Sequence, residues 1–387
     1  MKYIALNNSP LAGGGVEQVV RNLLDHFRPD FKRDLCLICS DPARGKEFEY
    51  AGVRCINVKA SWRGIADKMF FLGRYAYSYK LYKLLRALPQ DSIGIVNVHG
   101  IEYAFFPAFF RSELPTGMQL IVTVHGSNFD EISQYVVRGL PWKFLPVKAF
   151  YFFYRWVHFF AEKRTCRGVD FFTFINEYTQ RFYASRYRVE KTRGRVIYNG
   201  FEASEAKKRE NKTSRTFRAL IVGSTVYRKG LDLATGIVEK LRAEGHDVRL
   251  RIVGFADFPA YSRGRKWDFI DYIGRVPPEQ MSRYYEEADF LLFPSRFEGF
   301  PLTVLEALQH KLPVIVSQAC VFHEIPGYQA LGVVVEGLDQ DNWAQAVKEN
   351  VLNLEKYNVF LRGLNRLDLS DFAWAKIAAQ YEETLSR

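Results

Sequence analysis

The sequence contains few cysteines, and their arrangement argues against a disulfide-stabilised fold. The five cysteines are an odd number, and their spacing forms no disulfide framework. Cys36 and Cys39 form a CxxC pattern, but they lie in a strand-like run, where side chains three positions apart point to opposite faces of a sheet. We therefore expect both thiols to be buried apolar groups and not a metal or redox site.

Long apolar runs are also missing. No stretch approaches the roughly 18 consecutive uncharged apolar residues that a membrane-spanning helix requires. The first ten residues lack the apolar region of a signal peptide. These absences predict a cytoplasmic chain.

The formal net charge of +11 is distributed unevenly. Residues 1–200 hold 29 basic and 17 acidic side chains, an excess of 12, whereas the remaining residues hold 25 basic and 26 acidic ones. A basic half attracts nucleic acid, anionic lipid or a phosphorylated ligand. The spacings of helix-turn-helix, zinc-finger and RNP modules are absent, so we expect no nucleic-acid partner and an anionic lipid or phosphate partner instead.

Length and residue pattern predict two α/β domains. A chain of 387 residues exceeds the size at which one core usually stops growing. Runs of β-branched and aromatic residues alternate with helical periodicity in each half, which is typical of doubly wound parallel sheets. We expect an N-terminal domain at 1–201, a polar linker at 202–217, a C-terminal domain at 218–369, and a last helix at 370–387 that packs back onto the first domain.

Ligands of open parallel sheets bind where a strand ends and a loop leads into a helix N-terminus. The first such loop follows the initial strand and ends in three consecutive glycines, among them Gly14 and Gly15. Glycines let the backbone approach a ligand closely, and a helix start offers free N–H groups to a phosphate. Taken alone, the pattern also fits a loop without a ligand.

A second loop follows the first strand of the C-terminal half and ends at Gly230. Gly223 and Ser224 open it, and Arg228 and Lys229 stand directly before the glycine and a new helix. The planar fork of Arg and the compact charge of Lys suit a diphosphate. The position at a strand end favours this interpretation over a solvated pair of charges.

A third loop carries the strongest signal. A strand ends at Pro294, Glu298 follows in a glycine turn, and Glu306 comes eight residues later on a helix that begins near Pro301. Carboxylates accept pairs of hydroxyl hydrogen bonds, as a ribose or hexose diol requires, each worth about 1.5–3 kcal/mol. Exposed N–H groups over Phe300–Thr303 would serve further sugar or phosphate oxygens.

Together these motifs resemble glycosyltransferase family 4. The resemblance rests on the E-x7-E pair, the Arg-Lys-Gly turn, the N-terminal glycine loop with Glu17, and the segments Val196–Gly200 and Pro313–Ser317. It implies the GT-B fold, in which two Rossmann-like, doubly wound parallel-sheet domains face a central cleft. It also implies transfer with retention of configuration, and neither a metal nor another cofactor.

The resemblance also implies roles for individual residues. Arg228 and Lys229 would hold the donor diphosphate, Glu306 the ribose hydroxyls, and Glu298 the donor sugar. His125, at the end of a first-half strand, would face the sugar from across the cleft, and His99 competes for that role. The remaining donor-binding candidates are Gly14, Gly15, Gly223, Ser224, Arg275, Val276, Phe300, Pro301 and Leu302.

Residues 142–160 are unusually rich in aromatic side chains. As a helix, they place Phe153 and Phe160 on one face and Lys148 with Arg155 and Glu162 on another. Such a helix suits either a membrane interface or the core beside the sheet. We expect Phe153 and Phe160 to belong to the core. Membrane or acceptor contacts are expected at Glu17, His99, Trp142, Lys143 and Lys148, and near Trp62 and Arg63.

The sequence thus predicts a transferase that moves a hexose, preferably from a UDP-sugar, to a membrane-associated glycan or lipid-linked acceptor in cell-envelope or exopolysaccharide synthesis. It would act at the inner membrane surface. Two alternatives remain open: a soluble-acceptor synthase or sugar-nucleotide epimerase of the same fold, and a non-catalytic protein that binds anionic membranes. The basic first half disfavours a neutral soluble acceptor, and the glutamate pair disfavours an epimerase.

Overall fold

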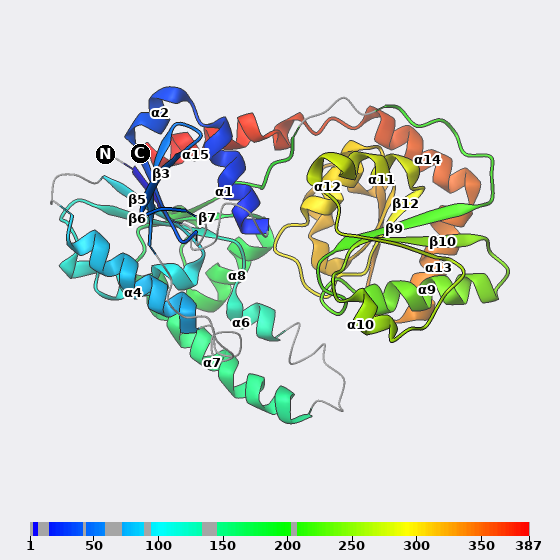
Figure 1. Ribbon diagram of the computed structural model, residues 1–387, viewed down its shortest axis with the longest axis horizontal. Coiled ribbons are helices and arrows are strands. Elements are labelled where there is room, and N and C mark those ends of the chain that lie inside the picture. The colour runs from blue at the N-terminus through cyan, green and yellow to red at the C-terminus, as the bar shows by residue number, and fades with distance from the viewer. Residues whose placement is uncertain are drawn as a thin grey trace. The chain divides into compact units, whose positions relative to one another are not determined.

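The computed structural model divides the chain into two units (Figure 1). It describes residues 3–6, 15–41, 44–58, 72–88, 94–133, 145–202 and 207–386. Unit 1 comprises Met1–Gly200 and Asp371–Arg387, and unit 2 comprises Phe201–Ser370. The C-terminal segment thus belongs to the first unit, and the division falls at Gly200.

The described strands of unit 1 form an eight-stranded sheet in the order β3-β4-β2-β1-β5-β6-β7-β8. All neighbours are parallel except β3 and β4. The chain winds outward from β1 in one direction and then from β5 in the other, so the strand order reverses between these two. The strands are Tyr3–Leu6 (β1), Leu35–Cys39 (β2), Glu47–Tyr50 (β3), Val53–Asn57 (β4), Ile95–His99 (β5), Gln119–Val124 (β6), Phe171–Phe174 (β7) and Gly194–Val196 (β8).

Helices cover both faces of this sheet, as buried strands such as β2 require. Helices α1, α2 and α15 lie on one face, and α4, α7 and α8 lie on the other (Figure 1). The α-helices in the described part of unit 1 are Gly15–His26 (α1), Pro29–Asp34 (α2), Leu72–Arg86 (α4), Phe105–Phe109 (α5), Asn128–Glu131 (α6), Leu145–Gly168 (α7), Glu177–Tyr187 (α8) and Trp374–Leu385 (α15).

Unit 2 contains a six-stranded, fully parallel sheet in the order β11-β10-β9-β12-β13-β14. Here the order reverses between β9 and β12. Helices α9 and α13 cover one face, and α11 and α12 cover the other (Figure 1). The elements are Phe217–Gly223 (β9), Leu231–Ala243 (α9), Val248–Gly254 (β10), Phe258–Ser262 (α10), Ile270–Gly274 (β11), Met281–Glu287 (α11), Phe290–Phe293 (β12), Leu302–Gln309 (α12), Val314–Ser317 (β13), Gly332–Val335 (β14), Gln340–Val347 (α13) and Leu354–Arg366 (α14).

Two doubly wound parallel sheets confirm the predicted fold class. Three local expectations need correction. The edge strand β3 is antiparallel to β4. The linker ends one residue earlier than expected, because Phe217 already belongs to β9. The last helix begins at Trp374, after a 3₁₀ turn at Ser370–Phe372, and its N-cap is Ala373 without a side-chain cap, so the predicted start at residue 370 is wrong.

Helix α7 is oriented opposite to expectation. Phe153 is 70% exposed and Phe160 is 64% exposed, so their assignment to the core is wrong. The buried residues of the helix are His158, Glu162, Thr165 and Cys166. The reason is that Glu162 accepts hydrogen bonds from the loop after β6, which turns the polar side of the helix inward.

Cys36 and Cys39 are buried and free, as predicted. Burial raises the pKa of the Cys39 thiol to about 12. None of the helices within the described ranges combines the length and apolarity needed to cross a membrane.

Candidate functional site

In unit 2, the second and third predicted loops meet where the strand order reverses. Strands β9 and β12 are neighbours, paired at Ala219 with Phe290 and at Leu220 with Leu291. The loops that follow them leave the same edge of the sheet in opposite directions. In open α/β sheets this is the place where ligands bind.

Lys229 and Glu298 form the centre of this site. The Lys229 Nζ lies 2.7 Å from Glu298 Oε1, and their side chains are only 17% and 6% exposed. Ser295 donates a hydrogen bond of 2.5 Å to the same carboxylate oxygen. The sequence-predicted cation and carboxylate therefore meet across 69 residues of chain and neutralise each other.

Further contacts fix the two loops to each other. The Arg228 carbonyl accepts from the Arg296 N–H at 2.9 Å, and the Ser295 hydroxyl oxygen lies 3.2 Å from the same carbonyl oxygen. Gly230 adopts φ +71, and a Cβ at this position would lie 2.0 Å from the Pro294 carbonyl oxygen. The glycine after Arg228 and Lys229 is thus required by close approach of the loops.

Arg228 is partly buried, and its guanidinium lies 5.8 Å from the centre of the Phe297 ring. Gly223 packs against the turn, since a Cβ there would lie 2.8 Å from Lys229 Cγ. Ser224 is exposed. Gly223 thus lies against Lys229 at the end of β9.

Glu306 lies on α12 and is partly buried. The Tyr285 hydroxyl donates to its Oε2 at 2.6 Å. Burial raises the pKa of the Glu306 carboxyl, and the bond from Tyr285 opposes that rise. Tyr285 is itself 1% exposed and stacks on His310 with ring centres 5.4 Å apart, so it is a fixed donor.

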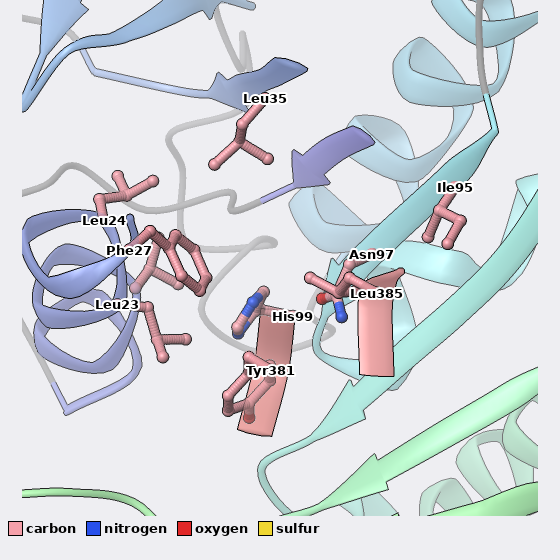
Figure 2. A pocket seen from close by; sticks show the side chains of 10 residues that line it. Leu23, Leu24, Phe27, Leu35, Ile95, Asn97, His99, Tyr381 and Leu385 are labelled. Carbon is pink, nitrogen blue, oxygen red and sulfur yellow. The ribbon is translucent and has the colours of Figure 1, made fainter. Parts of the chain in front are cut away.

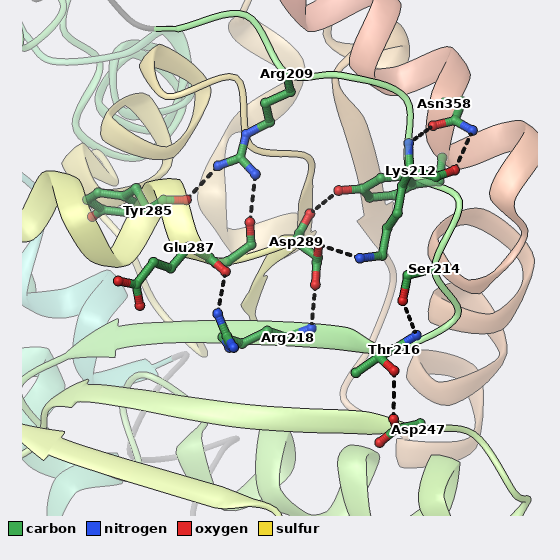
Figure 3. Close-up of polar contacts among 12 residues, drawn as sticks. Arg209, Lys212, Ser214, Thr216, Arg218, Asp247, Tyr285, Glu287, Asp289 and Asn358 are labelled. Carbon is green, nitrogen blue, oxygen red and sulfur yellow. Dashed lines mark hydrogen bonds and ion pairs between the residues drawn. The ribbon is translucent and has the colours of Figure 1, made fainter.

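Tyr285 is held in turn by the segment that leads into unit 2. Figure 3 shows Arg209 donating to the main chain of α11, with a bond to the Tyr285 carbonyl of 2.5 Å. Arg209 also donates to the carbonyls of Ala288 and His310. The linker segment is therefore packed on unit 2 and supports the end of α11.

The expectation of a row of free N–H groups at the start of α12 is wrong in part. Pro301 has no N–H, and the Leu302 N–H donates to the Phe300 carbonyl at 3.0 Å. Arg275 and Val276 follow β11, which β10 and β9 separate from β12 in the sheet. Arg275 is exposed and Val276 partly buried. They therefore follow a strand that lies two positions from β9 in the sheet.

In unit 1, His99 ends β5 and His125 follows β6 directly. His99 Nδ1 lies 3.1 Å from His125 Nε2. Burial lowers the pKa of His125 to about 4, and burial together with the neighbouring His125 lowers the pKa of His99 well below its usual value. Both rings are therefore neutral at pH 7, and one donates its N–H to the other.

His99 is anchored from the far end of the chain. Figure 2 shows its ring beside Tyr381 of α15, and the ring centres are 6.3 Å apart. Both residues line a small pocket between α1, α15 and the strands. His99 is only 4% exposed, and its ring lies within hydrogen-bond distance of His125. This burial favours a role in holding the His125 ring in place over the predicted contact with an acceptor.

The sequence alone did not identify several polar residues that lie at the same edge of the sheet. The Arg74 Nη1 donates to Glu102 at 2.8 Å and to Asn128 at 2.9 Å. Tyr178 donates to the buried Asp130 at 2.9 Å. The signal that would have found Glu102 and Asn128 is their position three residues after His99, which ends β5, and His125, which follows β6.

The remaining predictions concern unit 1 as well. Gly15 is the first residue of α1 and Glu17 lies in its first turn. Lys148 is a partly buried residue of α7. Gly14, Trp62, Arg63, Trp142 and Lys143 lie outside the described residues. In the part of the chain that the structure describes, no three His, Cys, Asp or Glu side chains are grouped to hold a metal ion.

Comparison with known families divides the chain as the structure does. A family model described as Glycosyltransferase Family 4 matches residues 13–205, and one described as Glycosyl transferases group 1 matches residues 202–361. The two matches overlap at residues 202–205 and together span residues 13–361.

Curated relatives match only part of the chain. It is 29% identical over 146 residues to the amylovoran biosynthesis glycosyltransferase AmsK of Erwinia amylovora, covering 32% of this chain and 36% of that protein. It is 26% identical over 167 residues to an uncharacterized glycosyltransferase of Methanocaldococcus jannaschii, covering 42% of each. The chain thus spans less than half the length of these relatives.

Solved structures match over the whole chain. A sucrose-phosphate synthase from Thermosynechococcus elongatus has a TM-score of 0.78 at 16% identity, covering 100% of this chain and 98% of that one. HepE of Anabaena in complex with UDP-glucose has a TM-score of 0.71 at 14% identity, covering 100% and 99%. The lipopolysaccharide outer core galactosyltransferase WaaB has a TM-score of 0.68 at 16% identity, also covering 100% and 99%. At these identities the likeness establishes the fold.

Proposed function

Because this chain belongs to the GT-B glycosyltransferases, with a Family 4 region followed by a group 1 region, we propose that it is a retaining hexosyltransferase. It takes a hexose from a UDP-sugar and transfers it to a membrane-associated glycan or lipid-linked acceptor. The product belongs to cell-envelope or exopolysaccharide synthesis, and the reaction takes place at the inner membrane surface without a metal or other cofactor.

The observation that carries this proposal is the meeting of Lys229 and Glu298 at the strand reversal of unit 2. We call Arg228, Lys229, Glu298 and Glu306 the donor site. Two cations stabilise the diphosphate as it leaves, and two carboxylates bind hydroxyl groups of the ribose and the sugar. Removal of one such electrostatic contact costs on the order of a hundredfold to a thousandfold in rate.

UDP is favoured as the donor nucleotide because HepE, which shares the fold, binds UDP-glucose. A polymeric or lipid-linked envelope acceptor is favoured because AmsK serves amylovoran biosynthesis and WaaB lipopolysaccharide synthesis. The basic charge of residues 1–200 supports an acceptor at an anionic surface. His125, neutral at pH 7, is the group proposed to hydrogen-bond the donor sugar from unit 1.

A soluble-acceptor synthase is the second candidate, because the chain also shares its fold with a sucrose-phosphate synthase. The two candidates differ in the acceptor and not in the donor. The excess of 12 basic residues in the first half favours the membrane acceptor, since a neutral sugar gains nothing from that charge.

Calorimetric titration with UDP, GDP and ADP tests the donor assignment. We expect UDP to bind most tightly and Glu306→Ala to weaken binding at least tenfold. Assays with UDP-hexoses and membrane extracts then test transfer, and NMR of the product tests retention of the anomeric configuration. Equal, weak binding of all three nucleotides would remove the basis of the proposal.

A further inference from the structure

Helix α7 presents apolar side chains to solvent along most of its length. Among the described residues, 14 large apolar side chains are exposed, and eight of them lie on this one helix. We call these eight residues the α7 outer face. They are Leu145, Val147, Phe150, Phe152, Phe153, Trp156, Val157 and Phe160.

The orientation of the helix is fixed by polar contacts on its inner side. Glu162 is 2% exposed and accepts from the hydroxyls of Ser127 and Tyr187, both at 2.7 Å. It also accepts from the Phe129 N–H at 3.2 Å. Rotation of α7 to bury the aromatic side would break these bonds and leave a carboxyl and an amide unsatisfied. The exposure of the α7 outer face is therefore a feature of the fold.

Basic side chains accompany the exposed rings. Helix α7 contains five basic residues, and its one acidic residue, Glu162, points inward. The Arg155 guanidinium lies 4.3 Å from the Phe152 ring centre and 5.4 Å from that of Trp156. Arg164 lies 4.7 Å from the ring of Phe109, another exposed aromatic residue next to the helix. Aromatic rings beside long cationic side chains are typical of the headgroup level of a membrane.

We propose that the α7 outer face inserts into an anionic membrane surface, with the helix lying in the plane of the headgroups. The apolar side would enter the boundary of the acyl chains, roughly 5–10 Å deep, and the basic side chains would reach lipid phosphates. This inference rests on the proposed function, which places the acceptor at a membrane, and it names the surface that docks there.

The positive charge of α7 favours lipid, and not a second copy of the chain, as the partner of the α7 outer face. Two α7 outer faces packed together would bring Arg155 of each copy, which lies against Phe152 and Trp156, into one interface, with no exposed acidic residue of α7 to offset its charge. Anionic lipid supplies the opposite charge. The occupant that fits both the apolar side chains and the charge is therefore a membrane rich in anionic lipid.

Docking through α7 has a consequence for the loop after β6. Ser127 and Phe129 are bonded to Glu162, so the loop is tied to the membrane-facing helix. Helix α6, which follows this loop, carries Asn128 and Asp130 at the sheet edge next to His125. A membrane-bound α7 holds this polar edge at a fixed distance from the lipid surface, where the head of a lipid-linked acceptor lies.

The test is co-sedimentation of the full chain with vesicles of equimolar phosphatidylglycerol and phosphatidylcholine, and with vesicles of phosphatidylcholine alone. We expect binding to the anionic vesicles that weakens with salt. The variant Phe153→Ser/Phe160→Ser should bind about a hundredfold more weakly, because each ring contributes about tenfold. The matched control is Leu338→Ser/Val359→Ser, which alters exposed apolar residues of unit 2 and should bind like the parent chain.

A fluorescence measurement locates the helix directly. The Trp156 emission, obtained as the difference between the parent chain and Trp156→Phe, should shift to shorter wavelength on anionic vesicles. Parent-like sedimentation of the Phe153→Ser/Phe160→Ser variant would overturn the proposal. So would a parent dimer that this variant converts to a monomer, without vesicle binding by either.

UDP binding, measured on the same samples without vesicles, separates this inference from the proposed function. Vesicle binding that depends on α7 without any UDP binding would contradict the transferase proposal and leave the docking surface supported. UDP binding without vesicle binding would reject the docking surface alone. Agreement of the circular dichroism spectra and thermal transitions of the parent and of Phe153→Ser/Phe160→Ser shows that unit 1 of the variant is folded.

Discussion

In the donor site, Lys229 and Glu298 are paired with each other in a nearly buried position. Each side chain compensates a charge that burial would otherwise make unfavourable. Loss of either residue alone therefore removes a ligand contact and also leaves an unpaired charge. Binding and stability are coupled at this pair.

The first prediction separates these two effects. Lys229→Met should lower the free energy of unfolding of unit 2 by about 3 kcal/mol, because the carboxylate of Glu298 loses its partner. The double variant Lys229→Met/Glu298→Gln should recover most of that stability and still fail to bind UDP. Thermal unfolding and calorimetric titration of the two variants measure both quantities. Recovery of UDP binding in the double variant would contradict a direct role of Lys229.

Tyr285 supports Glu306 in a way that a ligand can test. Tyr285→Phe removes the hydrogen bond to Oε2 and leaves the ring, its stacking on His310 and its burial unchanged. We expect the affinity for UDP to fall about fivefold to tenfold, since one hydrogen bond to a charged group is lost. The affinity for 2′,3′-dideoxy-UDP should stay the same, because that ligand has no ribose hydroxyls for Glu306. A parallel loss for both ligands would show that Tyr285 acts on the fold of the site as a whole.

At the scale of elements, the sequence predicts the loops of the donor site. It does not predict the residues that hold Glu306 and α11 in place. Glycines, cations and carboxylates at strand ends identify the turn before Gly230 and the turn around Glu298, because parallel strands deliver their loops to one edge of a sheet. Tyr285 and Arg209 carry no such signal. Their contacts to Glu306 and to α11 join residues 21 and 76 positions apart, and only the packing of α11 brings them together.

The orientation of helix α7 is a second feature that the sequence does not predict. Its periodicity separates an aromatic side from a polar side, but periodicity alone does not say which side faces the sheet. The usual assumption that apolar residues turn inward gave the wrong answer for Phe153 and Phe160. What decides the orientation is Glu162, whose partners Ser127 and Tyr187 lie 35 and 25 positions away.

Glu162 should make the stability of unit 1 depend on pH. Burial raises the pKa of its carboxyl from 4.5 to about 7 in the folded chain. The folded state thus binds the proton more tightly, so this stabilisation is complete below pH 4.5 and is lost as pH rises to about 7. Between pH 5 and pH 8, the parent chain should lose on the order of 3 kcal/mol relative to Glu162→Gln, which cannot ionise.

Urea unfolding of the parent chain and Glu162→Gln at several pH values measures this difference. Glu190→Gln, which replaces an exposed carboxyl of the same unit, is the control and should follow the parent at every pH. A constant difference between the parent and Glu162→Gln across this range would mean that the carboxyl keeps one protonation state.

At the scale of the whole molecule, the chain returns to its first unit. Helix α15 fills the core of unit 1 with Trp374, Ile377, Tyr381 and Leu385, all at most 4% exposed. A Cβ at Gly200 would lie 2.7 Å from the Trp374 ring, so the last helix packs directly on the end of the first segment. Unit 1 is complete only when residues on both sides of unit 2 are present, while unit 2 is one continuous segment.

This arrangement predicts that the two units respond to different perturbations. Deletion of residues 371–387 removes four large buried side chains, worth roughly 1.5–3 kcal/mol each, which approaches the 5–15 kcal/mol that stabilises an ordinary domain. Unit 1 should unfold or melt at a far lower temperature, whereas unit 2 keeps every element of the donor site.

Saturating UDP at about 100 times its Kd adds about 2.7 kcal/mol to the stability of whichever unit binds it. In calorimetry of the full chain, UDP should therefore raise one of two transitions by roughly 5–10 °C. That transition should persist, with its shift, in the shortened chain. If the deletion abolished the UDP shift, binding of the nucleotide would require an intact unit 1, and the donor site could not be confined to residues 201–370.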